Sequence, residues 1–223
     1  MKHSKSILCL LCALMLSAFS ANAKERNAEN NYGIAYSDTT MNPKQNKKVV
    51  IISSSDRRGG NTDLLCDEFA RGAREAGGNV EKIFLGDYNI NYFTEADEQR
   101  VGDRNHEATD DAPMLIDKLV DADVIVLSSP VWYMNMTGQL KTFIDRIYNR
   151  NREITGKEYF YITACGDDSE ETADKVITAF KWFVMCLPNS TERGAVKAVG
   201  VNSKGEVAGT EFMKQAYELG KKI

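Results

Sequence analysis

Residues 47–76, KKVVIISSSDRRGGNTDLLCDEFARGAREA, determine how the rest of the chain is organised. The β-branched apolar run at 49–52 predicts a buried strand, and a loop rich in serine, arginine and glycine follows it. From Thr62 onward apolar residues recur at helical spacing, which predicts an amphipathic helix. The first N–H groups of a helix point outward and the helix dipole favours negative charge there. The strand, loop and helix therefore predict an anion site.

The loop supplies the groups that bind a phosphate. Ser55, Asn61 and Thr62 offer neutral hydrogen-bond donors. Arg57 adds a guanidinium, and Gly60 lets the backbone bend towards a ligand. The same residues would also suit an ordinary strand-to-helix turn with Thr62 as the N-cap. Because the loop is neither GxxxxGKS/T nor GxGxxG, we do not expect a nucleoside triphosphate or a dinucleotide here.

The N-terminus has the pattern of an export signal. Two lysines precede an apolar run at 7–19 that is short for a membrane span, and a small-x-small sequence ends at Ala23. We therefore expect residues 1–23 to be a secretory signal peptide, with an uncleaved anchor as the alternative. Residues 24–46 are polar and predict a tether, and residues 47–223 predict one domain. The mature protein is then exported, periplasmic or extracellular, and has no membrane span.

Charge and cysteine content limit the function classes. Without the signal the chain has 26 basic and 32 acidic residues, a net charge of −6, which argues against a nucleic-acid surface. The three remaining cysteines, Cys66, Cys165 and Cys186, are widely spaced and show neither a disulfide framework nor metal-ligand spacing. We expect buried thiols, and one disulfide stays an alternative.

The rest of the chain alternates strands and helices. Further strands are expected at 80–85, 123–127, 159–164 and 195–201, each followed by a helical pattern. The alternation predicts an α/β three-layer sandwich, with a five-stranded parallel sheet of order 2-1-3-4-5 and helices on both faces. Ligands of such sheets bind at the carboxyl ends of the strands, where the strand order reverses. The loops at 53–61 and 128–136 should therefore meet.

The second of these loops, SSPVWYMNM at 128–136, is rich in aromatic residues. Trp132 and Tyr133 have rings that stack on a flat ligand or wall its edge, although they would also suit ordinary packing against a helix. Pro130 fixes the backbone, and we expect the N–H and C=O groups of 131–135 to be free to bind ring heteroatoms. Asn135 is equally typical of a turn. A phosphate site facing this loop predicts a mononucleotide with a flat ring.

Residues 54–62, SSDRRGGNT, and 129–146, SPVWYMNMTGQLKTFIDR, resemble the NAD(P)H-dependent FMN reductase and iron–sulfur flavoprotein branch of the flavodoxin-like superfamily. The resemblance implies a flavodoxin-like fold that binds FMN. It implies that the phosphate is held by Ser55, Arg57, Gly60, Asn61 and Thr62, and that the ring is lined by Pro130, Val131, Trp132, Tyr133, Met134 and Asn135. Gly166, after the fourth strand, would border the ring from the other side.

The sequence departs from the family pattern in three places. Ser54 and Asp56 stand where the family has Gly and Pro, and the order of the two aromatic residues is reversed. The iron–sulfur branch has a compact cysteine cluster in the segment that matches 86–111, whereas this chain has no cysteine between Cys66 and Cys165. We therefore expect FMN and no iron–sulfur cluster.

The resemblance implies an oxidoreductase in which the flavin carries the redox chemistry, so no side chain is expected to be catalytic. Electrons would pass from NADH or NADPH, or from another donor if the protein is exported, to a quinone-like or other small acceptor or to a redox partner protein. By analogy with the fold family we expect a homodimer. The alternatives are an exported electron carrier without enzymatic turnover and a phosphate-ligand binding module without a redox role.

Overall fold

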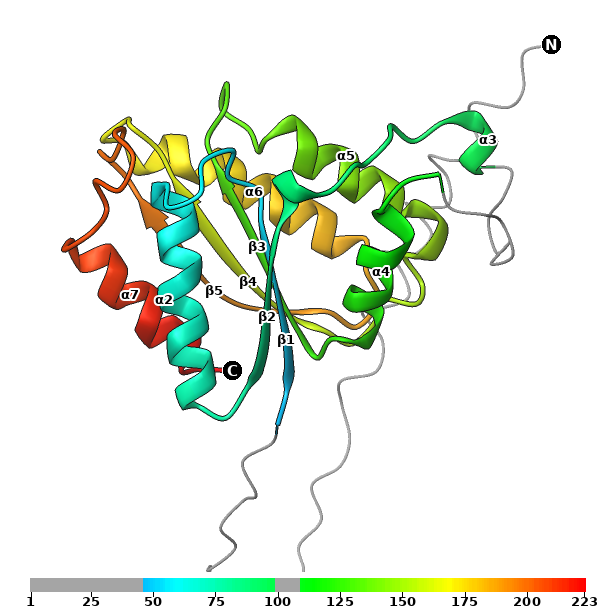
Figure 1. Ribbon diagram of the computed structural model, residues 1–223, viewed down its shortest axis with the longest axis horizontal. Coiled ribbons are helices and arrows are strands. Elements are labelled where there is room, and N and C mark those ends of the chain that lie inside the picture. Colours follow the sequence, from blue (N-terminus) through cyan, green and yellow to red (C-terminus); the bar gives the residue numbers. More distant parts are fainter. Residues whose placement is uncertain (1–45, 99–108) are drawn as a thin grey trace, which may run out of the picture. The chain divides into compact units, whose positions relative to one another are not determined.

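The structure is a computed structural model that describes residues 46–98 and 109–223 (Figure 1). The expected signal peptide and all of the expected tether except Asn46 lie outside the described residues. Within the described part of the chain, no helix is both long enough and apolar enough to cross a membrane.

Five parallel strands form one sheet of order β2-β1-β3-β4-β5, as the sequence predicts. The strands are β1 (Lys48–Ser53), β2 (Asn79–Phe84), β3 (Val124–Pro130), β4 (Glu158–Ala164) and β5 (Thr191–Ala198). β1 lies between β2 and β3, with Ile51 opposite Lys82 on one side and Val126 on the other. The strand order reverses at β1 and β3, so the loops that follow these strands lie side by side.

Helices cover both faces of this sheet and confirm the predicted three-layer arrangement. α2 (Asn61–Glu75) and α7 (Glu211–Gly220) lie together on one face (Figure 1). The other face carries α4 (Ala112–Asp121), α5 (Gly138–Arg146) and α6 (Glu170–Met185). Short helical turns are η1 (Leu85–Asp87), α3 (Glu95–Glu98) and η2 (Ile147–Arg150).

Alternate residues of each strand pack into two separate cores. Phe160 of β4 meets Phe69 of α2 on one face, with ring centroids 5.2 Å apart. Tyr161, the next residue, meets Phe180 of α6 on the other face at 5.6 Å. Both faces are therefore apolar, which explains why the central strands read as apolar runs without alternation.

α2 and α7 approach closely because each contributes a glycine to the contact. A Cβ on Gly72 would lie 2.1 Å from the carbonyl oxygen of Tyr217, and one on Gly220 would lie 2.1 Å from that of Phe69. No other residue fits at either position without moving a helix. The contact fixes α2, whose first turn faces the predicted site.

Two element boundaries differ from the prediction. α2 begins at Asn61 with Gly60 as its N-cap, so the alternative in which Thr62 is the N-cap is wrong. β5 spans Thr191–Ala198. Its first residues are polar because it is an edge strand, and its register against β4 shifts between Glu192 and Gly194. The expected strand at 195–201 was placed too late, and Val201 belongs to the loop after β5.

Candidate functional site

The loops that follow β1, β3, β4 and β5 enclose a cavity of about 220 Å³ at the carboxyl edge of the sheet. Eight of the twelve predicted site residues line it: Ser55, Arg57, Asn61, Thr62, Pro130, Val131, Trp132 and Gly166. Ala164, Cys165, Val201 and Asn202 complete the lining. Gly60, Tyr133, Met134 and Asn135 do not line this cavity.

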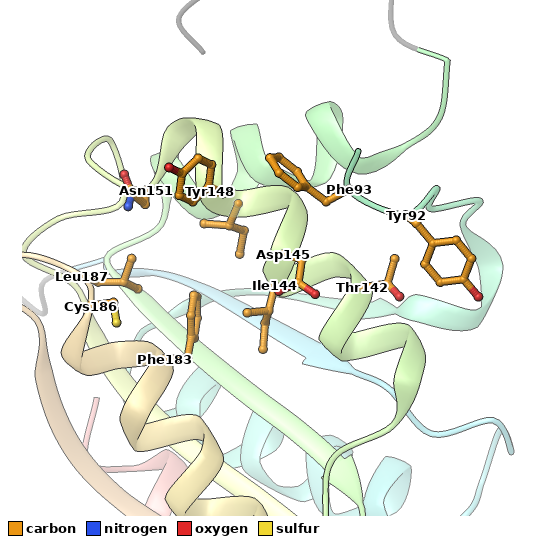
Figure 2. A pocket seen from close by; sticks show the side chains of 11 residues that line it. Tyr92, Phe93, Thr142, Ile144, Asp145, Tyr148, Asn151, Phe183, Cys186 and Leu187 are labelled. Carbon is orange, nitrogen blue, oxygen red and sulfur yellow. The ribbon is translucent and has the colours of Figure 1, made fainter. Parts of the chain in front are cut away.

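A larger hollow of about 480 Å³ lies on the sheet face that carries α5 and α6, where these helices meet the segment before α3 (Figure 2). Its walls are mainly apolar, with Ile144 and Phe183 between the helices and one charged residue, Asp145. The hollow does not contain the carboxyl ends of the strands. We therefore place the candidate site in the smaller cavity, where the sheet topology predicts it.

The turn after β1 is closed by hydrogen bonds within the turn itself. The N–H of Gly60 donates to the carbonyl of Arg57 at 2.8 Å. The hydroxyl of Ser55 accepts from the N–H of Arg57 at 3.2 Å and donates to its carbonyl at 3.1 Å. A Cβ on Gly60 would lie 2.8 Å from that carbonyl oxygen, so the turn requires glycine there. To donate to a ligand, the hydroxyl of Ser55 must therefore give up its hydrogen bond to the carbonyl of Arg57.

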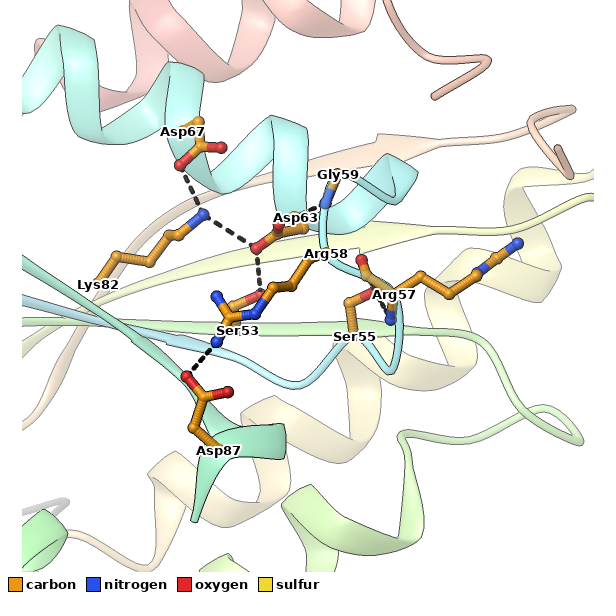
Figure 3. Close-up of polar contacts among 9 residues, drawn as sticks. All are labelled: Ser53, Ser55, Arg57, Arg58, Gly59, Asp63, Asp67, Lys82 and Asp87. Atoms are coloured by element: carbon orange, nitrogen blue, oxygen red, sulfur yellow. Dashed lines mark hydrogen bonds and ion pairs between the residues drawn. The ribbon is translucent and has the colours of Figure 1, made fainter. Parts of the chain in front are cut away.

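The carboxylate of Asp63 fixes the turn from behind (Figure 3). It is buried and accepts hydrogen bonds from the N–H of Gly59 at 2.8 Å, the hydroxyl of Ser53 at 3.0 Å and the ammonium of Lys82 at 2.9 Å. Burial raises the pKa of Asp63, but the bonds from Gly59 and Lys82 outweigh it and leave the pKa below its usual value. Asp63 is thus ionised, and its charge is directed away from the cavity.

The two arginines of the turn have different environments. Figure 3 shows their side chains pointing in opposite directions. Arg58 pairs with Asp87 and lies over the ring of Phe84, 4.3 Å from its centroid. Arg57 lines the cavity and has only a loose ion pair with Asp56, at 3.7 Å. Arg57 is therefore the guanidinium available to a ligand, as the sequence predicts.

The side chain of Asn61 has a role that the sequence analysis missed. Its amide nitrogen donates to the carbonyl of Val201 at 3.1 Å, and its amide oxygen accepts from the N–H of Val207 at 3.1 Å. The amide therefore docks the loop after β5 onto the start of α2. The amide carries a second N–H, so the role of Asn61 as a neutral donor to a phosphate stays a prediction. Thr62 is buried beside it in the cavity wall.

The loop after β3 forms a two-residue hairpin. Trp132 and Asn135 exchange N–H···O=C bonds of 2.8 and 3.0 Å. Tyr133 and Met134 lie between them with φ of 48° and 63°, the left-handed region that type I′ turns require and that non-glycine residues rarely occupy. Such strain persists where the surrounding structure enforces it, most often at functional sites.

The hairpin corrects one expectation about the backbone. The N–H of Val131 donates to the carbonyl of Ala164 at 3.1 Å, and the N–H groups of Trp132 and Asn135 are bonded within the hairpin. The expectation that all the backbone groups of 131–135 are free is therefore wrong. The side-chain oxygen of Asn135 accepts from the N–H of Met136, which agrees with a turn role for Asn135.

Aromatic side chains of the hairpin are exposed. Trp132 borders the cavity and is 51% exposed, and Tyr133 is 97% exposed. Ordinary packing against a helix, the alternative reading of this pair, is therefore wrong for Tyr133. Tyr133 instead borders a neighbouring hollow with Asp56 and Gln139. The indole of Trp132 is thus the aromatic surface closest to the predicted ligand.

Hydroxyl groups of buried Ser54 and half-buried Thr137 tie the two loops together. The hydroxyl of Thr137 donates to that of Ser54 at 3.0 Å, and Ser54 donates to the carbonyl of Ser128 at 2.8 Å. Thr137 also accepts from the N–H of Leu140 and is the N-cap of α5. Ser54, which replaces the family's glycine, thus connects the turn after β1 to the start of α5.

The loops after β4 and β5 form the remaining wall. A Cβ on Gly166 would lie 3.0 Å from the Cβ of Asn202, so the two loops are in contact. Cys165 presents a thiol whose pKa is raised by burial, and its sulfur donates to the carbonyl of Asp167. Asn202 was missed because the fifth strand was expected to continue to Val201. The topology alone could have indicated Asn202, because the residues that follow each parallel strand lie at the carboxyl edge of the sheet.

The cavity wall combines hydrogen-bond donors, one arginine and an indole, the groups that bind a phosphorylated ligand with a flat ring. The chain is similar to an iron–sulfur flavoprotein of Archaeoglobus fulgidus, with 30% identity over 181 residues that cover 79% of this chain and 78% of that protein. It is also similar to an FMN-dependent NADH:quinone oxidoreductase of Bordetella parapertussis, with 27% identity over 195 residues that cover 77% of this chain and 92% of that protein.

Solved structures confirm the predicted flavodoxin-like fold. The azoreductase from Bacillus anthracis superimposes with a TM-score of 0.64 at 17% identity, over 79% of this chain and 100% of that one. At this identity the similarity shows the fold alone. Residues 47–198, more than half of the sequence, match the family described as NADPH-dependent FMN reductase. The chain therefore belongs to the NADPH-dependent FMN reductase family, and the resemblance inferred from its two loop motifs is confirmed.

Proposed function

We propose that this FMN-dependent oxidoreductase binds the FMN phosphate at the turn after β1 and the flavin ring between the hairpin after β3 and Gly166. The observation that carries the proposal is the cavity itself, which joins the first turn of α2 and Arg57 to Trp132. The helix N-terminus and the guanidinium suit a phosphate, and the indole suits a flat ring. FMN supplies the redox chemistry when bound, and the chain supplies binding and orientation.

We propose NADH or NADPH as the electron donor and a quinone-like or other small molecule as the acceptor. The Bordetella relative is named as a FMN-dependent NADH:quinone oxidoreductase, which supports both choices. The opening beside the half-exposed Trp132 gives such molecules access to the ring. If the protein is exported, a membrane-bound or protein donor could replace the nicotinamide. The comparisons give no support to the alternative of an electron carrier without turnover.

We propose that no iron–sulfur cluster accompanies the flavin, although a similar protein is named an iron–sulfur flavoprotein. The sequence has no cysteine between Cys66 and Cys165. Both of these are buried free thiols, and within residues 46–98 and 109–223 no group of three or more His, Cys, Asp or Glu side chains is arranged to hold a metal. Iron and sulfide analysis of the purified protein should find neither element.

We propose that the protein is exported after cleavage at Ala23 and that it forms a homodimer. The export proposal rests on the N-terminal sequence, and N-terminal sequencing of the secreted protein tests it. The homodimer proposal draws on the exposed Trp182 and Met185 of α6, because large apolar side chains on a surface commonly mark an interface. Light scattering after size-exclusion chromatography should give twice the monomer mass.

The central test is flavin retention by the mature chain, residues 24–223. The protein is incubated with FMN, desalted, and examined by visible absorption, and then mixed anaerobically with NADH or NADPH and a soluble quinone. We expect retained flavin bands that are bleached by the nicotinamide and restored by the quinone. A folded protein that retains no flavin would contradict the proposed site. Retained flavin without turnover would favour the electron carrier.

A further inference from the structure

The loop at 201–209, between β5 and α7, is a built part of the cavity wall. Asn61 holds it at Val201 and at Val207, which is fully buried. The carboxylate of Glu206 accepts from the N–H groups of Asn202 and Ser203, both at 2.7 Å. These bonds fix the loop next to the start of α2.

The fixed loop carries one cation, Lys204, to the turn after β1, next to the residues that line the cavity. The Cε atom of Lys204 lies 3.7 Å from the position of a Cβ on Gly59, and the ammonium is one bond further along. Gly59 immediately precedes Gly60, the N-cap of α2. Lys204 therefore lies beside the turn that leads into the helix end proposed for the phosphate.

Lys204 has no ion-pair partner in the part of the chain that the structure describes. Among the described residues no carboxylate lies within ion-pair distance of it, whereas Arg58 and Lys82 are paired with Asp87 and Asp63. Glu206, two residues away, is engaged with backbone N–H groups. A lysine beside the positive end of a helix is electrostatically unfavourable unless an anion binds there.

We propose that Lys204 is a further cofactor-binding residue, which contacts the phosphate end of the ligand and makes the site select flavin with a phosphate over flavin without one. The inference rests on the proposed function and adds a specificity determinant from a loop that the sequence motifs do not include. In this proposal Lys204 adds a second cation to Arg57 and the first turn of α2, which line the cavity.

The test measures affinity for FMN and for riboflavin by flavin fluorescence, in low salt and in 1 M salt. The variants are Lys204→Gln, Lys204→Arg and, as a control for the lost charge, Lys222→Gln. Lys222 lies beyond the C-terminal end of α7, where neighbouring Ile223 contacts the opposite edge of the sheet at Gly78. All measurements use the mature chain.

We expect Lys204→Gln to weaken FMN binding about five- to tenfold in low salt and to leave riboflavin binding unchanged. The difference should shrink in 1 M salt, and Lys204→Arg should restore binding. Unchanged FMN affinity would overturn the proposal, and so would an equal loss for both flavins, which would mean that Lys204 only packs the loop. If the unmodified protein binds neither flavin, the proposed function itself fails, and this outcome is distinct from the other two.

Discussion

The two loops that meet at the cavity are built in opposite ways. The turn after β1 is anchored from the protein interior, where buried Asp63 accepts from the N–H of Gly59 and from two side chains. The hairpin after β3 is closed by two backbone bonds and holds Tyr133 and Met134 in the left-handed region with exposed side chains. One loop gains stability from its contacts, and the other stores strain.

The difference fits the two ends of the proposed ligand. A phosphate binds best to donors that are already in place, because no reorganisation is then needed. A flat ring is bound by aromatic surface, which must stay uncovered until the ligand arrives and which therefore contributes little to folding. We infer that changes in the turn reduce stability, whereas changes in the hairpin raise it and reduce function.

The largest expected effect comes from removing the anchor of the turn. Asp63→Ala deletes the acceptor of three hydrogen bonds and leaves the partly buried Lys82 with the more exposed Asp67 alone. Breaking such a pair should lower the free energy of unfolding by about 3 kcal/mol. Urea unfolding monitored by circular dichroism measures this loss.

Asp67→Ala is the matched control, because Asp67 binds the same ammonium from an exposed position. It should cost only about 0.5 kcal/mol. Equal losses in the two variants would mean that the salt bridge to Lys82, and not the bond to the turn at Gly59, provides the stability.

The second largest effect should come from Asn61, which anchors the loop after β5 to the start of α2. Asn61→Ala removes both bonds that hold the loop after β5 and leaves buried groups at Val201 and Val207 without partners. We expect a loss of about 2 kcal/mol in the free energy of unfolding, and weaker binding of FMN and riboflavin alike. Unfolding and flavin titration measure the two effects. Unchanged stability would show that the contacts of Glu206 suffice to hold this loop.

Sequence patterns predict one kind of feature in this protein and miss another. The sheet order and the meeting of the two loops follow from the alternation of apolar runs, which reflects local burial. The role of Asn61 depends on Val201 and Val207, which lie 140 and 146 residues further along the chain, and no local pattern records such a contact. The hairpin was missed because Tyr-Met is not a typical type I′ sequence.

Substitutions in the hairpin should raise the stability of the protein, whereas those in the turn after β1 lower it. The double substitution Tyr133→Asn with Met134→Gly installs the residues that type I′ turns prefer and removes the strain at both positions. We expect a gain of about 1 kcal/mol in the free energy of unfolding, together with slower turnover, because the aromatic surface is reduced. Urea unfolding and steady-state quinone reduction measure the two changes. A destabilised variant would show that the left-handed pair is not strained.

The smallest expected effect is the response of stability to acid. It should differ between the two regions, because the turn after β1 is anchored by a buried carboxylate and the hairpin is not. Burial raises the pKa of Asp63, but hydrogen bonds from Gly59, Lys82 and Ser53 leave it below its usual value in the folded state. As the pH falls, the unfolded chain therefore takes up the proton first. The stabilisation by ionised Asp63 is complete above about pH 4 and is lost as the pH falls through the lower folded-state pKa. The difference in free energy of unfolding between the unmodified protein and Asp63→Asn should shrink in that range. The difference between the unmodified protein and the hairpin double variant should stay constant. Equal pH dependence of the two differences would contradict the assignment of the anchor to Asp63.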